Sequence, residues 1–278
     1  MDLSVIIPIY HGRKYIPSLL KMLDENISNA KEYMIEVILV NDSPDETIDD
    51  LIMGYNNIFV VNNKRNLGIQ GARIQGIKEA HGKYILMLDQ DDELKEYAIQ
   101  SQLSKIKGYD AILANGYSED KNNNKVSLYK NKRQKKLVNS FKYYLYYGNM
   151  VASPGMVVIK KDKIPKIWLE NILTNNGADD WLLWASYVKK GYKFNMNADY
   201  IYTHRNVTTN FSNDEDKMLT SSMEALNMMK NNMSNKEYNI HKRTLNMRRK
   251  ILTNPDSKLL EYLKNIDIAT YLLFYKMI

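Results

Sequence analysis

The chain has 278 residues, no cysteine, a formal net charge of +7 and a pI near 9.1. Because cysteine is absent, the chain has no disulfides and no thiolate metal site, so a bound metal would be a hard cation with oxygen ligands, such as Mg²⁺ or Mn²⁺. No run of about 18 apolar residues occurs, and no basic segment with a long apolar stretch opens the chain. We therefore expect a cytoplasmic protein without a membrane-spanning helix or a secretion signal.

Four apolar segments alternate with helical stretches in the first third of the chain. Residues 3–10, 36–41, 58–62 and 84–88 are rich in Val, Ile and Leu, which is typical of parallel strands buried on both faces. Residues 68–80 carry an apolar stripe at helical spacing. This alternation predicts an α/β fold with a Rossmann-like, doubly wound and mostly parallel sheet, in which ligands bind beyond the carboxyl ends of the strands.

Polar residues follow these predicted strands, and the densest group is Asp89-Gln90-Asp91-Asp92 after the fourth. Three carboxylates at the end of one strand repel one another unless a cation or a hydrogen-bond network holds them. The run therefore predicts a divalent metal site. The alternative is that Asp91 or Asp92 caps a helix that begins near Glu93, because aspartate is a favoured N-cap.

The middle of the chain has a looser pattern. Further strands are expected at residues 110–115, 150–159 and 193–203. The polar tract 119–125 predicts a loop. Residues 130–136 form a basic block on or beside a loop, which is either solvated or in contact with phosphate. A helix is expected over residues 179–190, and Gly191 offers a natural C-cap for it.

The last part of the chain, from residue 213 onward, has the composition of helices, and Asn254-Pro255 offers a helix start. An apolar face is supplied by Leu259, Leu260, Leu263, Ile266, Leu272, Leu273 and Phe274. This tail either packs against the main body or docks at a membrane surface. In the second case the nearby cations would lie close to anionic headgroups: Arg248, Arg249, Lys250, Lys258 and Lys264.

Five motifs occur in order: Ser4-Val5-Ile6-Ile7-Pro8-Ile9-Tyr10, Val40-Asn41-Asp42-Ser43, Asn66-Leu67-Gly68 through Ala72-Arg73, Leu88-Asp89-Gln90-Asp91-Asp92, and Asp179-Asp180-Trp181. Together they resemble family 2 glycosyltransferases of the GT-A fold over about the first 205 residues. The resemblance implies a nucleotide-diphosphate-sugar donor. It also implies three regions: 1–115 for the nucleotide sugar, 116–212 for the acceptor and the catalytic base, and 213–278 as a helical C-terminal extension.

On the donor side, the resemblance implies that Asp91 binds the metal, Mn²⁺ or Mg²⁺, and that Asp89 faces the ribose. Asp42 would accept a hydrogen bond from a base N–H; alternatively it is a turn residue before Pro44. Arg73 would point toward the base or a phosphate; otherwise it is a solvated helix residue. The remaining donor contacts implied are Pro8, Ile9 and Tyr10 around the base, Gln90 within the Asp-x-Asp element, and Asn66 and Gly68 in the loop under the donor.

On the acceptor side, the resemblance implies that Asp180 is the catalytic base and Asp179 its supporting acid. An inverting transfer is a single displacement, so a carboxylate must take the proton of the acceptor hydroxyl. The alternative is that both aspartates only supply favourable charge to a helix N-terminus. His204 would contact the diphosphate or complete the metal coordination, and otherwise has a structural role. Trp181 and Trp184 are expected to be packing residues, with sugar stacking as the lesser alternative for Trp181.

The resulting hypothesis is a metal-dependent inverting glycosyltransferase that moves a hexose-type sugar, UDP-linked in preference to GDP or dTDP, to a hydroxyl of a lipid-linked glycan. Its location would be cytoplasmic, or peripheral at the inner face of the plasma membrane. One alternative is a sugar nucleotidyltransferase, although residues 8–13 lack the glycine run of such enzymes. Another is a non-catalytic nucleotide-sugar-binding or scaffold protein. Nucleic-acid binding is not expected, because no aromatic platform accompanies the basic residues.

Overall fold

The computed structural model describes residues 1–205 and 214–277. The chain divides into two compact units that interleave along the sequence. The first unit comprises Met1–Leu128, Ser153–Ile164 and Lys193–Val207, and the second comprises Tyr129–Ala152, Pro165–Tyr192 and Thr208–Ile278. The three regions predicted from the sequence instead follow the chain consecutively, and the predicted boundary between residues 212 and 213 lies outside the described residues.

The first unit is built on a mixed sheet with the strand order β3-β2-β1-β4-β8-β6-β9-β5, and β7 pairs with β6. Its strands are β1 (Leu3–Ile9), β2 (Ile35–Asn41), β3 (Ile58–Asn62), β4 (Tyr84–Met87), β5 (Glu93–Leu94), β6 (Ala111–Glu119), β7 (Lys125–Ser127), β8 (Val157–Lys160) and β9 (Phe194–Arg205). The first four strands in this order are mutually parallel, as are β6 and β9, while β8, β5 and β7 pair antiparallel. The predicted α/β fold with a mostly parallel sheet is confirmed.

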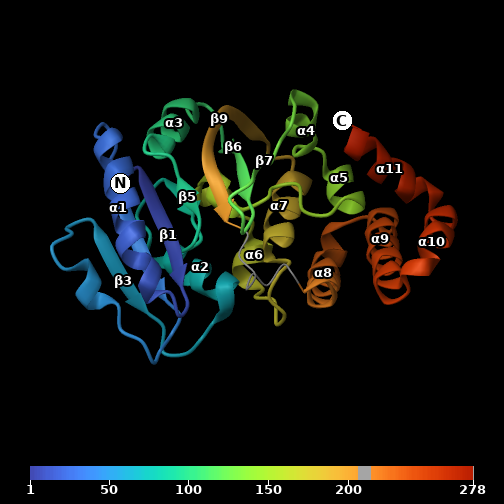
Figure 1. Cartoon of the computed structure of the whole chain (residues 1–278), viewed down its shortest axis with the longest axis horizontal. Helices are drawn as coiled ribbons and strands as arrows, with labels where there is room; N and C mark the ends of the chain where they lie inside the picture. Colours follow the sequence, from blue (N-terminus) through green and yellow to red (C-terminus); the bar gives the residue numbers. More distant parts are fainter. Residues whose placement is uncertain (206–213, 278) are drawn as a thin grey trace. The chain divides into compact units, whose positions relative to one another are not determined.

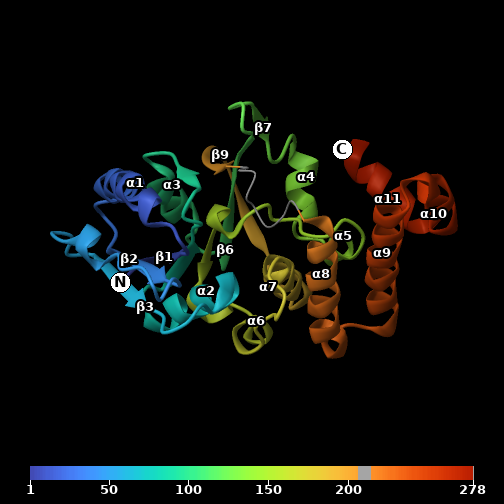
Figure 2. The same cartoon turned by 60° about the horizontal axis from the view of Figure 1, so that its bottom comes forward.

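The parallel half of this sheet is covered on both faces. Helices α1 (Ile16–Asn29) and α3 (Ala98–Lys105) lie on one face, and α2 (Gly68–Glu79) lies on the other (Figures 1 and 2). All seven residues of β1 are buried, which explains its continuous apolar sequence. At Gly76 a Cβ atom would collide with the Ile6 side chain, so glycine is required where α2 approaches β1.

The register of the strands places the predicted motifs at one edge. Ile9 pairs with Asn41 across β1 and β2, and Asn41 pairs with Asn62 across β2 and β3. The Leu88 N–H donates to the Ile6 carbonyl at 2.9 Å, so the chain leaves β4 beside the end of β1. The polar residues that follow these strands therefore meet at the carboxyl edge, where α/β sheets bind ligands.

Two local predictions were wrong. Of the strand expected at 150–159, only the last part belongs to β8, because Ser153 caps a short 3₁₀ turn, Pro154–Met156, by accepting a hydrogen bond from the Gly155 N–H. The basic block at 130–136 lies largely in a helix, α4 (Lys132–Leu137), because the Asn131 side chain caps it. The loop predicted at 119–125 is confirmed as the turn between β6 and β7.

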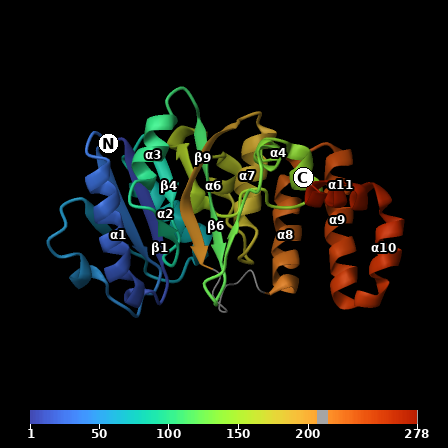
Figure 3. The same cartoon turned by 45° about the horizontal axis from the view of Figure 1, so that its top comes forward.

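The second unit is helical. Besides α4 it contains α5 (Phe141–Tyr146), α6 (Lys166–Glu170), α7 (Asp179–Lys189), α8 (Glu215–Met229), α9 (Asn235–Thr253), α10 (Lys258–Lys264) and α11 (Ile266–Met277). Helix α7 occupies the predicted range, and Gly191 behind it has a φ of +85°. Helices α8 and α9 form a hairpin, and α10 and α11 follow beside α9 (Figures 2 and 3). The predicted helical C-terminal region is thus present.

A capping box begins α9. The Ser234 side chain accepts from the Glu237 N–H, and the Glu237 carboxylate accepts from the Ser234 N–H. Among the helices of the described residues, none combines the length and the apolar character needed to cross a membrane.

Candidate active site

The carboxylate run that follows β4 is a loop between two strands. Asp92 is followed directly by β5, and the next helix, α3, begins only at Ala98. The alternative that Asp91 or Asp92 caps a helix near Glu93 is therefore wrong. Each of the three aspartates has a different environment, and these environments decide what each carboxylate can do.

Asp89 is held by a buried arginine. The Arg73 guanidinium lies 2.6 Å from Asp89 Oδ1, and the two side chains are 3% and 25% exposed. Helix α2 carries Arg73 to this position on the face opposite α1. The alternative of a solvated Arg73 is wrong, because its side chain is buried. A buried guanidinium requires an acidic partner, and Asp89 is that partner. This ion pair fixes the first carboxylate of the Asp-x-Asp element.

Asp92 is fully enclosed by a second set of partners. The Tyr202 hydroxyl donates to its Oδ2 atom, the Ser153 hydroxyl lies 3.4 Å from the same oxygen, and His204 Nδ1 lies 3.0 Å from Oδ1. Burial raises the pKa of Asp92 to about 6. The hydrogen bond to Asp92 raises the pKa of His204.

Sequence reasoning missed both Tyr202 and Ser153. They contact Asp92 from 110 and 61 residues away, and neither belongs to a recognisable motif. The His204 side chain is 29% exposed and its Nδ1 atom faces Asp92. Its predicted contact with a metal or a diphosphate stays a prediction.

Asp91 lines a cavity of about 320 Å³ in the first unit. The cavity wall also includes Tyr15, which precedes α1, Met22 of α1, and the basic residues Lys125 and Arg205. Burial, and next the charge of Asp89, raise the pKa of Asp91. The negative charges of Asp89 and Asp91 repel each other, and a bound cation would reduce this repulsion.

A hard divalent cation fits the carboxylate oxygens of Asp91, which lines the cavity, whereas Asp89 is paired with Arg73. Within residues 1–205 and 214–277, no group of three or more acidic or histidine side chains is arranged to enclose a metal. Mg²⁺ in nucleotide sites is usually held by one or two carboxylates together with substrate phosphates. A cation at this edge would therefore take its remaining ligands from a diphosphate and water.

Gln90 joins the carboxylate loop to the end of β1. Its side-chain oxygen accepts from the Tyr10 N–H at 3.0 Å, and its side-chain nitrogen donates to the Tyr10 carbonyl at 3.2 Å. Pro8 and Ile9 are buried within β1, whereas the Tyr10 ring is 50% exposed at its end. An exposed ring next to the carboxylates can stack on a planar ligand. The base-pocket role of these three residues stays a prediction.

Asp42 organises the adjoining loop. Its Oδ1 atom accepts from the Asn63 side chain and from the Leu67 N–H, both at 2.8 Å. The Asn66 side chain accepts from the N–H of Gly68, which has a φ of +73° and begins α2. Since left-handed φ values favour glycine, this turn explains the Asn-Leu-Gly sequence. The donor contacts predicted for Asp42, Asn66 and Gly68 stay predictions.

In the second unit, Asp179 and Asp180 occupy the first turn of α7. Asp179 is 4% exposed, and the preceding Ala178 N–H donates to the Ser221 hydroxyl of α8 at 3.0 Å. Acidic residues in this position interact favourably with the helix N-terminus. The location agrees with both interpretations, so the base role of Asp180 and the supporting role of Asp179 stay predictions.

Trp181 and Trp184 are packing residues, as predicted, and are 4% and 0% exposed. The Trp181 indole stacks on His241 of α9, with ring centroids 4.4 Å apart and an interplanar angle of 3°, and donates to the Tyr144 carbonyl at 3.0 Å. His241 Nδ1 lies 2.8 Å from the Leu145 carbonyl. Burial lowers the pKa of His241 to about 4, so the ring is neutral near pH 7. The tail therefore packs on α5 and α7 within this unit.

Comparison with known proteins identifies the family. The profile of glycosyl transferase family 2 matches residues 4–168, which is more than half of the chain, so the chain belongs to this family. Its fold is similar to that of S. aureus TarS 1–349 solved in complex with UDP-GlcNAc, with a TM-score of 0.58 at 18% identity, covering 88% of this chain and 72% of that one. The protein is therefore a glycosyltransferase of the GT-A fold.

Two curated relatives show how far the similarity extends. Glycosyltransferase GlyG of Streptococcus pneumoniae is 30% identical over 133 residues, which cover 46% of this chain and only 43% of GlyG. The putative teichuronic acid biosynthesis glycosyltransferase TuaG of Bacillus subtilis is 26% identical over 225 residues, covering 74% of this chain and 81% of TuaG.

Proposed function

We propose that this glycosyltransferase moves a sugar from a UDP-sugar to a hydroxyl of a glycan acceptor by a metal-assisted, inverting displacement. The observation that carries the proposal is that the three aspartates have different surroundings. Arg73 forms an ion pair with Asp89, a buried hydrogen-bond network holds Asp92, and Asp91 lines a cavity. Similarity to TarS, which was crystallised with UDP-GlcNAc and with UDP, supports the choice of UDP.

Asp91 would hold Mn²⁺ or Mg²⁺ together with the donor diphosphate, and Asp89, paired with Arg73, would face the ribose. Such a cation neutralises the negative charge that develops on the departing nucleoside diphosphate, without transfer of a proton. The protein contributes a fixed geometry, because Arg73 restrains Asp89 and the Gln90–Tyr10 hydrogen bonds restrain the loop. Positioning of this kind supplies much of the rate enhancement in enzymes.

Asp180 would act as the base on the acceptor. In a single displacement, the acceptor oxygen forms a bond to the anomeric carbon while the bond to the diphosphate oxygen breaks, and the configuration inverts. The acceptor proton passes to the Asp180 carboxylate as the new bond forms. Asp179, which is buried in the same helical turn, would keep that turn in place.

The acceptor would be a lipid-linked glycan of a surface polysaccharide, and the enzyme would be cytoplasmic with peripheral contact at the inner face of the plasma membrane. The names of two relatives support this acceptor class: TuaG, and the minor teichoic acid biosynthesis protein GgaB of Bacillus subtilis, which is 35% identical over 107 residues. The aligned segment spans only 12% of GgaB.

A direct assay tests the proposal. Purified protein with Mn²⁺, a panel of UDP-sugars and glycan acceptors should release UDP, and Asp91→Asn and Asp180→Asn should each nearly abolish that release. Asp162→Asn is the matched control, because this side chain is 74% exposed on the surface. UDP release that survives both site substitutions and a chelator would contradict the proposal, as would release of pyrophosphate or donor binding without any turnover.

A further inference from the structure

Helix α10 presents its apolar residues to solvent and its acidic residue to the protein. Leu259, Leu260 and Leu263 are 72%, 52% and 61% exposed, and Ile266 at the start of α11 is 59% exposed. Glu261 of the same helix is only 4% exposed. An amphipathic helix of a soluble protein normally shows the opposite arrangement. We refer to Leu259, Leu260, Leu263 and Ile266 as the α10 apolar face.

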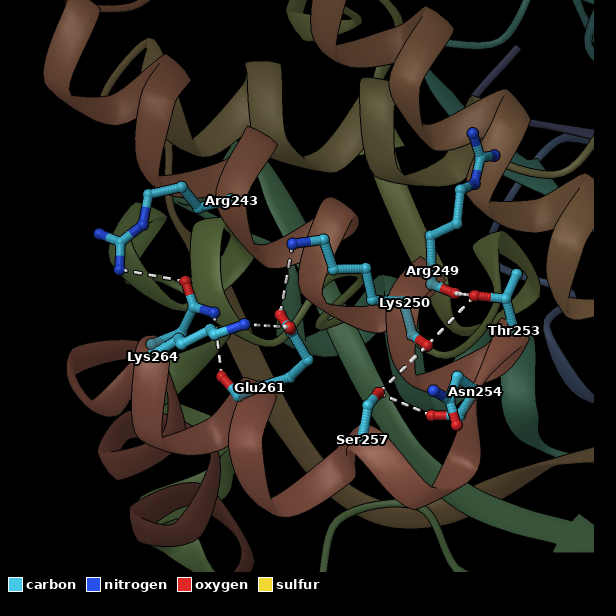
Figure 4. A network of polar contacts seen from close by, with 9 residues as sticks. Arg243, Arg249, Lys250, Thr253, Asn254, Ser257, Glu261 and Lys264 are labelled. Atoms are coloured by element: carbon cyan, nitrogen blue, oxygen red, sulfur yellow. Dashed lines mark hydrogen bonds and ion pairs between the residues drawn. The ribbon is translucent and has the colours of Figure 1, made fainter.

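A polar network holds α10 in this orientation (Figure 4). The Glu261 carboxylate lies 3.7 Å from the Lys250 ammonium of α9 and 3.5 Å from that of Lys264. The Asn265 side chain donates to the Glu261 carbonyl at 2.9 Å. A buried carboxylate needs such partners, because burial without them is strongly unfavourable. Turning the leucines inward would therefore separate Glu261 from Lys250 of α9, whereas Lys264 lies on the same helix and would turn with it.

A second set of contacts fixes the start of α11. The Arg243 guanidinium of α9 donates to the Asp267 carboxylate at 2.8 and 3.0 Å and to the Asn265 side chain at 3.2 Å. Ile268 is fully buried in a cluster with Leu145, Tyr146 and Met247. Both ends of the α10 apolar face are thus anchored to the rest of the unit, and the exposed leucines are a fixed surface feature.

The charges around the α10 apolar face indicate which binding partner it suits. Residues 235–278 contain nine lysines and arginines but only four aspartates and glutamates. Lys258 is exposed beside Leu259, and the side chains of Lys250 and Lys264 are 62% and 55% exposed. A second copy of the chain would bring two basic rims together, which is repulsive. An anionic lipid surface buries the leucines and also neutralises the lysines, whose long stems reach headgroups.

We propose that the α10 apolar face inserts into the surface of an anionic bilayer, with the surrounding lysines on the headgroups. This inference deepens the proposed function, since it identifies the surface for the peripheral contact. It does not depend on catalysis, because vesicle binding is measured without donor or acceptor. A protein that transfers sugar but ignores vesicles, or the reverse, therefore separates the two proposals.

The test uses the full chain and vesicles of phosphatidylcholine with or without an equal part of phosphatidylglycerol, in a flotation assay. Wild type should bind the anionic vesicles at least about tenfold more tightly than the neutral ones, and Leu259→Ser/Leu263→Ser should lose at least about tenfold. Lys258→Gln should weaken binding about fivefold. Met34→Ser/Met53→Ser is the matched control, since these methionines are 63% and 81% exposed in the first unit, and it should bind like wild type.

Three outcomes would overturn the inference. Wild type could fail to bind anionic vesicles, or the leucine variant could bind as well as wild type while its circular dichroism spectrum shows that it is folded. In sedimentation velocity without lipid, wild type could form a dimer that the leucine variant loses, which would make a second copy the occupant. UDP release by the leucine variant with a soluble acceptor should stay at the wild-type rate.

Discussion

The two acidic sites of this protein differ in how far their surroundings define them. At the sheet edge of the first unit, Asp89 and Asp92 have partners that restrain them, and Asp91 faces a cavity, so each carboxylate has a distinct environment. At the start of α7 in the second unit, Asp179 and Asp180 occupy a position that stabilises any helix. The restraint of the donor-side carboxylates therefore follows from contacts, whereas the donor-binding roles and the base role both stay predictions that depend on the family motif.

The largest expected effect is the loss of activity on substitution of Asp180, which tests the base role at the start of α7. Asp180→Asn should lower kcat by about 10²–10⁴-fold, because a positioned base contributes that much to a proton transfer. Donor affinity should change little, since Asp180 would act on the acceptor. Steady-state kinetics and equilibrium titration with UDP measure the two quantities. Equal kcat values for wild type and Asp180→Asn would show that the first turn of α7 has only a structural role.

The stacked pair in the second unit predicts a loss of stability. His241→Ala should lower the free energy of unfolding by about 2–4 kcal/mol, because it leaves a cavity against Trp181 and removes the partner of the Leu145 carbonyl. His241→Phe keeps a ring against Trp181 and should lose less. Urea denaturation gives both values, and an unchanged midpoint for His241→Ala would contradict the packing described.

The same histidine gives the second unit a pH dependence. The pKa of His241 is lowered to about 4 in the folded protein, so its contribution to stability is present above its ordinary value of 6.5 and is lost as the pH falls toward 4. Wild type should thus lose more stability than His241→Phe on acidification from pH 7 to pH 4. Parallel melting curves for the two proteins would contradict this.

The hydrogen-bond network around Asp92 in the first unit predicts the opposite dependence of stability on pH. The pKa values of Asp92 and His204 are both raised in the folded protein, so their contribution is present at low pH and is lost as the pH rises through about 6 and beyond. Asp92→Asn should lower the free energy of unfolding by about 1–3 kcal/mol near pH 4 and by less at pH 8. Melting temperatures of the two proteins across this range give the difference, and a constant difference would contradict the raised pKa of Asp92.

Much of the fold could be predicted from the sequence, because β1 and β2 are buried on both faces, β4 is largely buried, and all three read as continuous apolar runs. The strand at 58–62 was also predicted, but β3 lies at the end of the strand order and is only partly buried, so its expected burial on both faces was wrong. Helix α7 was predicted with its glycine cap. Residues 150–156 were wrongly predicted as strand, since Met150, Val151 and Met156 are buried without strand pairing. Helix α4 was missed because its basic sequence has no apolar stripe.

The candidate site could be predicted in part. The run at 89–92 identified the carboxylates, but the sequence did not indicate which of them is restrained. That distinction comes from Tyr202 and Ser153, whose contacts with Asp92 are formed only in the folded chain. Arg73 was expected at the site, yet its burial against Asp89 could not be inferred from its place in a helix.

The most direct test of the different roles of Asp91 and Asp92 is the Mn²⁺ affinity of the UDP complex. Mn²⁺ is titrated into wild type, Asp91→Asn and Asp92→Asn, and electron paramagnetic resonance measures the free ion. Asp92 contacts His204, a predicted metal ligand, and would therefore be an outer partner of the metal site. Loss of an outer partner typically weakens metal binding about 10–100-fold, and loss of a ligand itself should weaken it further. Asp91→Asn should therefore lose more than about a hundredfold in Mn²⁺ affinity, and Asp92→Asn clearly less. Wild-type affinity in Asp91→Asn would contradict the assignment of Asp91 as the metal ligand.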